Sequence, residues 1–111
     1  MWLEMYMNGD VTVIALAGNL DSTTAPDLRE HLGQLVAGRG PVLLDLSQVP
    51  RVSGGGLRIL LVARRQAEQN GTRLTLAGMP AEVRAVMAAT GFLEFFAVAD
   101  TVAAGVQAMA A

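Results

Sequence analysis

The fold class is decided by Pro41-Val42-Leu43-Leu44-Asp45-Leu46, a short and almost continuously apolar stretch. A strand that is covered on both faces is apolar throughout, so this pattern predicts a short buried strand. After a loop, residues 56–69 have the apolar period of a helix and end at Asn70-Gly71, and residues 73–77 resemble a further strand. A strand, a helix and a strand in succession indicate an α/β fold with a partly parallel sheet.

The segment upstream of this stretch adds a hairpin and a helix. Asn8-Gly9-Asp10 is a turn signal between strand-like runs at 2–7 and 11–17. A helix is expected from Thr24, with Pro26 in its first turn and Asp27 completing a pattern similar to a capping box. Its predicted buried stripe consists of Leu28, Leu32, Leu35 and Val36. The helix is predicted to end at Gly38-Arg39-Gly40.

The downstream segment continues the alternation of strands and helices. It predicts a helix at 80–90, a last short strand at 95–98 and a closing helix at 101–110. The length of 111 residues suits one compact domain over residues 1–111 and is too short for two.

Composition excludes several classes of function. The net charge of −2 gives no electrostatic case for binding nucleic acid or an anionic membrane surface. No apolar run approaches the roughly 18 residues of a membrane span, and the first residues lack the basic region of a signal peptide. The absence of Cys removes disulfides and thiolate chemistry and fits a reducing compartment. We therefore expect a cytoplasmic protein that does not insert into a membrane.

The sequence offers no convergent set of catalytic or metal-binding groups. His31 is the only histidine and is interpreted as a partly exposed helix residue. Asp45 follows the buried strand and is interpreted as a residue that caps a loop, in preference to a catalytic acid. The other carboxylates are scattered, so we expect no enzyme, no metal site and no cofactor.

The glycine-rich segment Ser53-Gly54-Gly55-Gly56 precedes the second helix. A helix start with free N–H groups can accept an anion, but no Gly-Lys-Ser/Thr follows as in a P-loop. Considered alone, the segment is interpreted as a flexible turn with Ser53 as the helix cap. A nucleotide or other small ligand at this turn is the weaker alternative.

The second helix has more apolar residues than one face requires. Burial under neighbouring elements is the simpler explanation for most of them, and contact with a partner or a second copy is the alternative. The residues concerned are Leu57, Ile59, Leu60, Leu61, Val62 and Ala63.

Several stretches together resemble the STAS family, in particular the anti-sigma-factor antagonists, and they cover nearly the whole chain. They are Gly18–Arg29, Leu43–Val49, Gly56–Leu61, Thr72–Gly78 and Thr90-Gly91-Phe92. The resemblance implies a mixed sheet of four to five strands with helices packed mainly on one face. It also implies partner switching, in which the antagonist binds a kinase-like anti-sigma factor that phosphorylates it, and a phosphatase resets it. ATP and Mg²⁺ then belong to the kinase.

The motif at the start of the second helix departs from the family pattern. The family commonly has Asp-Ser-Ser-Gly-Leu, with the second Ser as phosphate acceptor, whereas this chain has Ser53-Gly54-Gly55-Gly56-Leu57. Gly55 occupies the acceptor position and has no hydroxyl, so Ser53 is the nearest phosphoacceptor candidate along the chain. Asp21 matches the family's acidic loop residue, for which a partner contact and a simple turn role are equally good interpretations.

The resemblance implies a partner-binding surface formed by the loop before the first helix and the start of the second. It comprises Asp21, Ser22, Thr23, Thr24, Ser53, Gly54, Gly55, Gly56, Leu57 and Arg58. An Arg at Gly55 is expected to weaken partner binding while leaving the fold intact.

Two roles remain open for a domain of this family. The first is an anti-sigma factor antagonist-like module that binds an anti-sigma factor or a related kinase-like protein. The alternative is a STAS subunit of a transport or stress-signalling scaffold complex, because the same fold serves both roles. A weak homodimer is a further candidate assembly.

Overall fold

The computed structural model of the chain describes residues 1–36 and 40–110. The predicted helix end at Gly38-Arg39 lies outside the described residues, and so does the side chain of Leu35.

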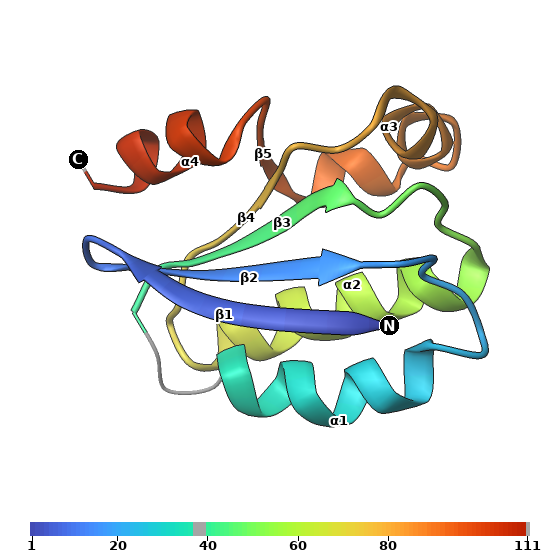
Figure 1. Cartoon of the computed structure of the whole chain (residues 1–111), viewed down its shortest axis with the longest axis horizontal. Helices are drawn as coiled ribbons and strands as arrows, with labels where there is room; N and C mark the ends of the chain where they lie inside the picture. Colours follow the sequence, from blue (N-terminus) through green and yellow to red (C-terminus); the bar gives the residue numbers. More distant parts are fainter. Residues whose placement is uncertain (37–39, 111) are drawn as a thin grey trace.

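The centre of the molecule is a five-stranded sheet in which spatial order equals chain order (Figure 1). The first two strands pair antiparallel, and each later strand pairs parallel to the one before it. The mixed sheet of four to five strands is therefore confirmed. The strands are β1 (Trp2–Asn8), β2 (Val11–Ala17), β3 (Val42–Gln48), β4 (Leu74–Ala77) and β5 (Ala97–Ala99).

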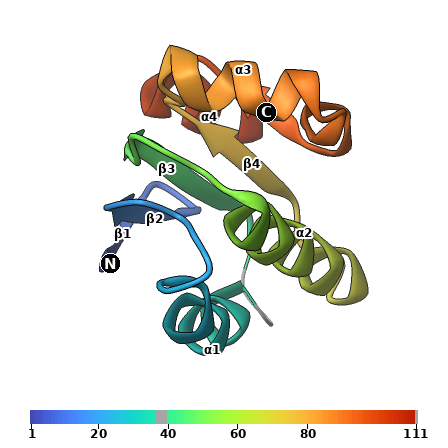
Figure 2. The same cartoon turned by 90° about the vertical axis from the view of Figure 1, so that its right-hand side faces the viewer.

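Two helices lie side by side on one face of the sheet, and another lies on the opposite face (Figures 1 and 2). The first pair is α1 (Ala25–Val36) and α2 (Gly54–Gln69), and α4 (Val102–Met109) packs on β3, β4 and β5 from the other side. The buried residues of α3 (Ala81–Ala89) join the same core as α1 and α2, while the helix itself is drawn beside α4 (Figures 1 and 2). Among the described residues, none of these helices has the length and apolar character needed to cross a membrane.

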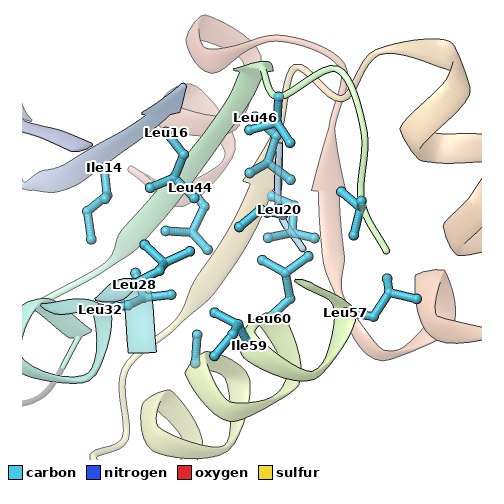
Figure 3. Close-up of a cluster of buried hydrophobic side chains, with 14 of the residues drawn as sticks. Ile14, Leu16, Leu20, Leu28, Leu32, Leu44, Leu46, Leu57, Ile59 and Leu60 are labelled. Carbon is cyan, nitrogen blue, oxygen red and sulfur yellow. The ribbon is translucent and has the colours of Figure 1, made fainter. Parts of the chain in front are cut away.

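The larger core fills the space between the sheet and the pair α1 and α2, as Figure 3 shows. Ile14, Leu16, Leu44 and Leu46 point from β2 and β3 toward side chains of the two helices, among them Leu28, Leu32, Ile59 and Leu60. The intervening residues Val11, Val13 and Leu43 form a second cluster on the other face with Ala77 of β4 and Met109 of α4. Because both faces of β2 and β3 are covered, both strands are apolar almost throughout, which is the pattern that predicted them.

The end of the chain differs from the prediction for residues 95–98. The strand lies at 97–99, and residues Phe92–Phe95 form a short 3₁₀ helix. Gly91 has a positive φ of 80°, which turns the chain directly after α3. Phe95 then lies outside the sheet, with the guanidinium of Arg64 stacked 5.6 Å from the centre of its ring. The aromatic run suggested a strand by propensity, and this local turn overrides that propensity.

Candidate partner-binding surface

Two loops that leave the same end of the sheet are hydrogen-bonded to each other (Figure 1). The loop before α1 and the loop before α2 follow the neighbouring parallel strands β2 and β3. The Leu20 N–H donates to the Arg51 carbonyl at 2.9 Å, and the Ser53 N–H donates to the Leu20 carbonyl at 2.8 Å. This bridge brings the segment Asp21–Thr24 beside the segment Ser53–Arg58, two groups of residues for which the family resemblance implied one surface.

The three glycines at the start of α2 have three different environments. A Cβ at Gly56 would lie 2.3 Å from the Leu20 carbonyl oxygen, and a Cβ at Gly55 would lie 3.0 Å from the Cα and N of Ser22. A Cβ at Gly54 would meet nothing within 4 Å. Gly55 and Gly56 therefore allow the two loops to approach closely, which is a different role from that of a flexible turn.

This packing corrects the expected effect of an Arg at Gly55. The Cβ alone would press on the backbone of Ser22, so the substitution would disturb the local structure as well as the surface. Gly54 is exposed and has free space, so it is the position where bulk can be added without a clash.

A capping box fixes the loop before α1, and it lies three residues earlier than the predicted pattern. Asp21 Oδ1 accepts the Thr24 N–H at 3.1 Å, and Thr24 Oγ1 accepts the Asp21 N–H at 3.1 Å. The Ala25 N–H donates to the Asp21 carbonyl at 2.9 Å, so helical hydrogen bonding already begins at Asp21. The expectation that Thr24 and Asp27 form the box is therefore wrong, because Asp21 and Thr24 already satisfy the free donors at the helix start.

The carboxylate of Asp21 is held in its charged form. The Thr23 hydroxyl donates to Oδ1 at 2.6 Å, and the N–H groups of Thr24 and Thr23 donate to the same oxygen at 3.1 and 2.9 Å. These donors lower the pKa of Asp21 below its ordinary value of 3.8. The surface therefore carries a fixed negative charge beside Ser22.

Ser53 stands at the N-cap position of α2 without capping it through its side chain. The predicted capping role of its hydroxyl is therefore wrong. Ser53 is exposed, and its carbonyl accepts the Leu57 N–H at 2.9 Å. The first turn of α2 is held by backbone contacts to Leu20, so the hydroxyl is not needed there.

The ten residues assigned to the surface differ in exposure. Ser22, Thr23, Ser53, Gly54 and Arg58 are exposed, whereas Gly56 and Leu57 are buried. The buried pair positions the turn from below, so a partner would contact the exposed members. The half-buried members are Asp21, Thr24 and Gly55.

A groove of 680 Å³ runs between α1 and α2 and begins at Ser22 and Gly55. For the apolar residues of the second helix, the sequence left open burial within the chain or contact with a partner. Leu61 and Val62 are half-buried in this groove, and the other four residues of that group are buried. Sequence reasoning had missed Arg29 and Arg65, whose positions next to the apolar stripes of their helices were the available signal. The remaining lining residues are Ala25, Pro26, Arg58 and Ile59.

The two residues considered for catalysis have local structural contacts. His31 is exposed, and its Nδ1 lies 2.8 Å from the Asp27 carbonyl oxygen. Asp45 lies within β3, not after it, and accepts the Ser47 N–H at 3.0 Å. In the part of the chain that the structure describes, no three His, Cys, Asp or Glu residues are grouped so as to hold a metal ion.

Comparison with known proteins identifies the family. A family model described as "Mlab, STAS domain" matches residues 4–98. The chain belongs to the STAS domain family. A relative from Bordetella bronchiseptica, BtrV, is provisionally named as an anti-sigma factor antagonist. It is 32% identical over 102 residues, which are 91% of this chain and 88% of BtrV. The resemblance to the antagonists, expected from the sequence, is therefore confirmed.

Two further comparisons bear on this STAS domain. Osmosensory protein A of Mycobacterium tuberculosis is 27% identical over 81 residues, or 73% of this chain, and the match spans about half (51%) of that protein. The crystal structure of an anti-sigma factor antagonist from Mycobacterium paratuberculosis has a TM-score of 0.89 at 22% identity, covering 99% of this chain and 94% of the other. This likeness confirms the STAS fold.

Proposed function

We propose that this STAS domain is an anti-sigma factor antagonist-like protein-binding module in a bacterial partner-switching circuit. Its partner is an anti-sigma factor or a related kinase-like protein, and it acts in the cytoplasm by binding, without catalysis or a cofactor of its own. The name of the relative BtrV, which is similar over most of both chains, supports this role.

The observation that carries the proposal is the bridge between the two loops. Hydrogen bonds of Leu20 with Arg51 and Ser53, together with the close approach at Gly56, hold the exposed residues of both loops in one arrangement. A surface that is already ordered loses little conformational entropy when a partner binds. The exposed Ser22, Thr23, Ser53 and Gly54 are small, so they suit a partner that packs closely on the turn.

Binding to purified kinase-like anti-sigma factors from the same organism tests the proposal. Calorimetry should show binding by the native chain and about tenfold or greater weakening by Gly54→Arg, because bulk and charge enter a closely packed contact. Gln107→Arg on α4 adds the same side chain at an exposed position on the other face of the sheet and should not change the affinity. If Gly54→Arg binds every such partner as tightly as the native chain, this surface is not the binding site.

We further propose that phosphorylation at the family's usual position does not switch this domain. A phosphate adds about −1.5 to −2 charges, which a closely packed interface would have to desolvate. Gly55 has no hydroxyl to accept it. The nearest hydroxyls belong to Ser53, two residues away in the chain, and to Ser22, whose backbone packs on Gly55. Binding is therefore constitutive or controlled by the abundance of either protein.

Incubation with each kinase-like partner and Mg-ATP, followed by intact-mass measurement, tests this part. We expect an unchanged mass. A stoichiometric gain of one phosphate on Ser53 or Ser22, together with loss of partner binding, would show a displaced switch. A resetting phosphatase belongs to the circuit only in that second case.

Weak self-association is the remaining element of the proposed partner set. β1 forms one edge of the sheet, and its outer side is unpaired in the described structure. Trp2 and Met7 are 67% and 59% exposed, and Met5 and Tyr6 are also exposed. An apolar edge strand of this kind can pair with a second copy.

A further inference from the structure

The groove between α1 and α2 combines an apolar floor with basic walls. Pro26, Ile59, Leu61 and Val62 supply apolar surface, and no carboxylate is among its lining residues. Arg29 projects from α1, and Arg58 and Arg65 project from α2, so both walls carry positive charge. Apolar surface flanked by one sign of charge is typical of a binding groove for an amphipathic segment of the opposite charge.

The three arginines of the groove have no partner among the described residues. Elsewhere on the molecule, Arg64 pairs with Glu68 at 2.7 Å and Arg84 pairs with Asp100 at 3.3 Å. The guanidinium groups of Arg29, Arg58 and Arg65 are exposed and make no hydrogen bond or ion pair within the described chain. Their charges are therefore available to an external carboxylate, which guanidinium can bind through two parallel hydrogen bonds.

The walls of the groove also restrict the backbone of its occupant. Both walls are α-helices, whose interior N–H and C=O groups are paired within each helix and cannot add a strand. A helix satisfies its own backbone groups, so it suits a groove whose walls offer it no backbone partners. Arg58 and Arg65 are seven residues apart on α2, which is about 10 Å along the helix axis.

We propose that this groove binds an amphipathic, acidic helix of a partner protein. The apolar stripe of that helix packs on Leu61 and Val62, and two carboxylates seven residues apart face Arg58 and Arg65. A third carboxylate, on the other side of the stripe, faces Arg29. The charge of Asp21 beside Ser22 disfavours acidic residues at that end of the groove. The inference rests on the proposed function, because Ser22, Gly55 and Arg58 belong to both surfaces.

A pair of synthetic helical peptides provides the test. Each has 18 residues with leucines at i, i+3, i+4 and i+7 spacing; one carries Glu at flanking positions seven apart, and the other carries Lys at the same positions. The Glu peptide should shift the backbone amide signals of the groove residues in ¹⁵N–¹H spectra of the full chain. Added salt should lower the affinity for this peptide, because it screens the charges. The Lys peptide should leave these signals in place.

Charge reversal supplies the matched variants. Arg29→Glu combined with Arg65→Glu should lower the affinity for the Glu peptide by about tenfold. Gln107→Glu adds a negative charge at an exposed position of α4, outside the groove, and should have little effect. Unchanged thermal unfolding of the variants would show that the fold is intact. Equal effects of both peptides, no effect of either, or reproduction of the shifts by inorganic phosphate would overturn the proposal.

The kinase-like partner separates this inference from the proposed function. A partner that is weakened by Gly54→Arg and unaffected by the double reversal would overturn the groove as a helix site and leave the proposed function standing. Peptide binding in the groove without binding of any kinase-like protein would overturn the proposed function and leave the groove standing as a helix site.

Discussion

Gly56 and Gly54 are two positions apart in the chain, yet only Gly56 lies against another backbone segment. Gly56→Ala places a Cβ 2.3 Å from the Leu20 carbonyl oxygen, and either the helix or the loop must move. Overpacking of this kind costs about 1–3 kcal/mol, and we expect the upper part of that range because the contact is with backbone. Urea unfolding measures the loss.

Gly54→Ala is the control for this prediction. Its Cβ meets nothing within 4 Å, so the free energy of unfolding should stay unchanged or rise by up to about 1 kcal/mol through the lower entropy of the unfolded chain. Equal destabilisation by the two substitutions would show that general flexibility, and not the contact with Leu20, explains the glycines.

The lowered pKa of Asp21 predicts a pH dependence of stability. A carboxyl whose pKa is lower in the folded state stabilises the fold above its ordinary value of 3.8, and this stabilisation is lost as the pH falls through the folded-state pKa. Asp21→Asn keeps an acceptor oxygen but has no charge. The native chain should therefore be more stable than the variant at neutral pH, and the difference should shrink below pH 3.8. Chemical unfolding across this pH range measures it; a difference that is constant with pH would contradict the assignment.

The N-termini of α2 and α4 offer a matched pair of hydroxyl residues at the scale of whole elements. Thr101 Oγ1 accepts the Ala104 N–H at 3.0 Å, whereas the Ser53 side chain makes no capping hydrogen bond. Thr101→Ala should lower the free energy of unfolding by about 1 kcal/mol, the usual cost of losing an N-cap. Ser53→Ala should change it by less than about 0.5 kcal/mol, as is usual for a surface substitution. Denaturation of both variants decides; a comparable loss for Ser53→Ala would show that its hydroxyl caps α2.

The main elements could be predicted because each has its own periodic pattern. The stripe Leu28 and Leu32 indicated α1, and the apolar runs of β2 and β3 reported burial on both faces. The bridge between Leu20 and Arg51 could not be derived from periodicity, because it joins loops about thirty residues apart. Only the family resemblance indicated that these loops share a surface.

The groove between α1 and α2 could not be predicted from the sequence for a similar reason. Its walls combine residues of α1 with residues of α2, and the spacing along either helix does not state which side faces the other. The capping box of α1 was predicted three residues too late, because two residue pairs have its spacing. The structure uses Asp21 and Thr24, and the prediction used Thr24 and Asp27. The packing of the loop on α2 favours the earlier pair.

The open edge of the sheet affects the molecule as a whole. β1 has four large exposed apolar side chains and a single charged residue, Glu4. We expect concentration-dependent association in sedimentation velocity, and Met5→Lys should reduce it because a charge on an edge strand opposes pairing. Gln107→Lys, on exposed α4 surface, should leave it unchanged. Native chain that stays monomeric at the highest concentrations measured would contradict this use of β1.

The agreement between strand order and chain order bears on synthesis at the ribosome. The β1–β2 hairpin can form first, and each later strand can join the free edge as it emerges, since none is inserted between two earlier ones. α4, however, follows all five strands in the chain and covers Val11, Val13 and Leu43. Before α4 emerges, the nascent domain therefore has a nearly complete sheet with one exposed apolar face. Docking of α4 on this face removes the surface most prone to aggregation.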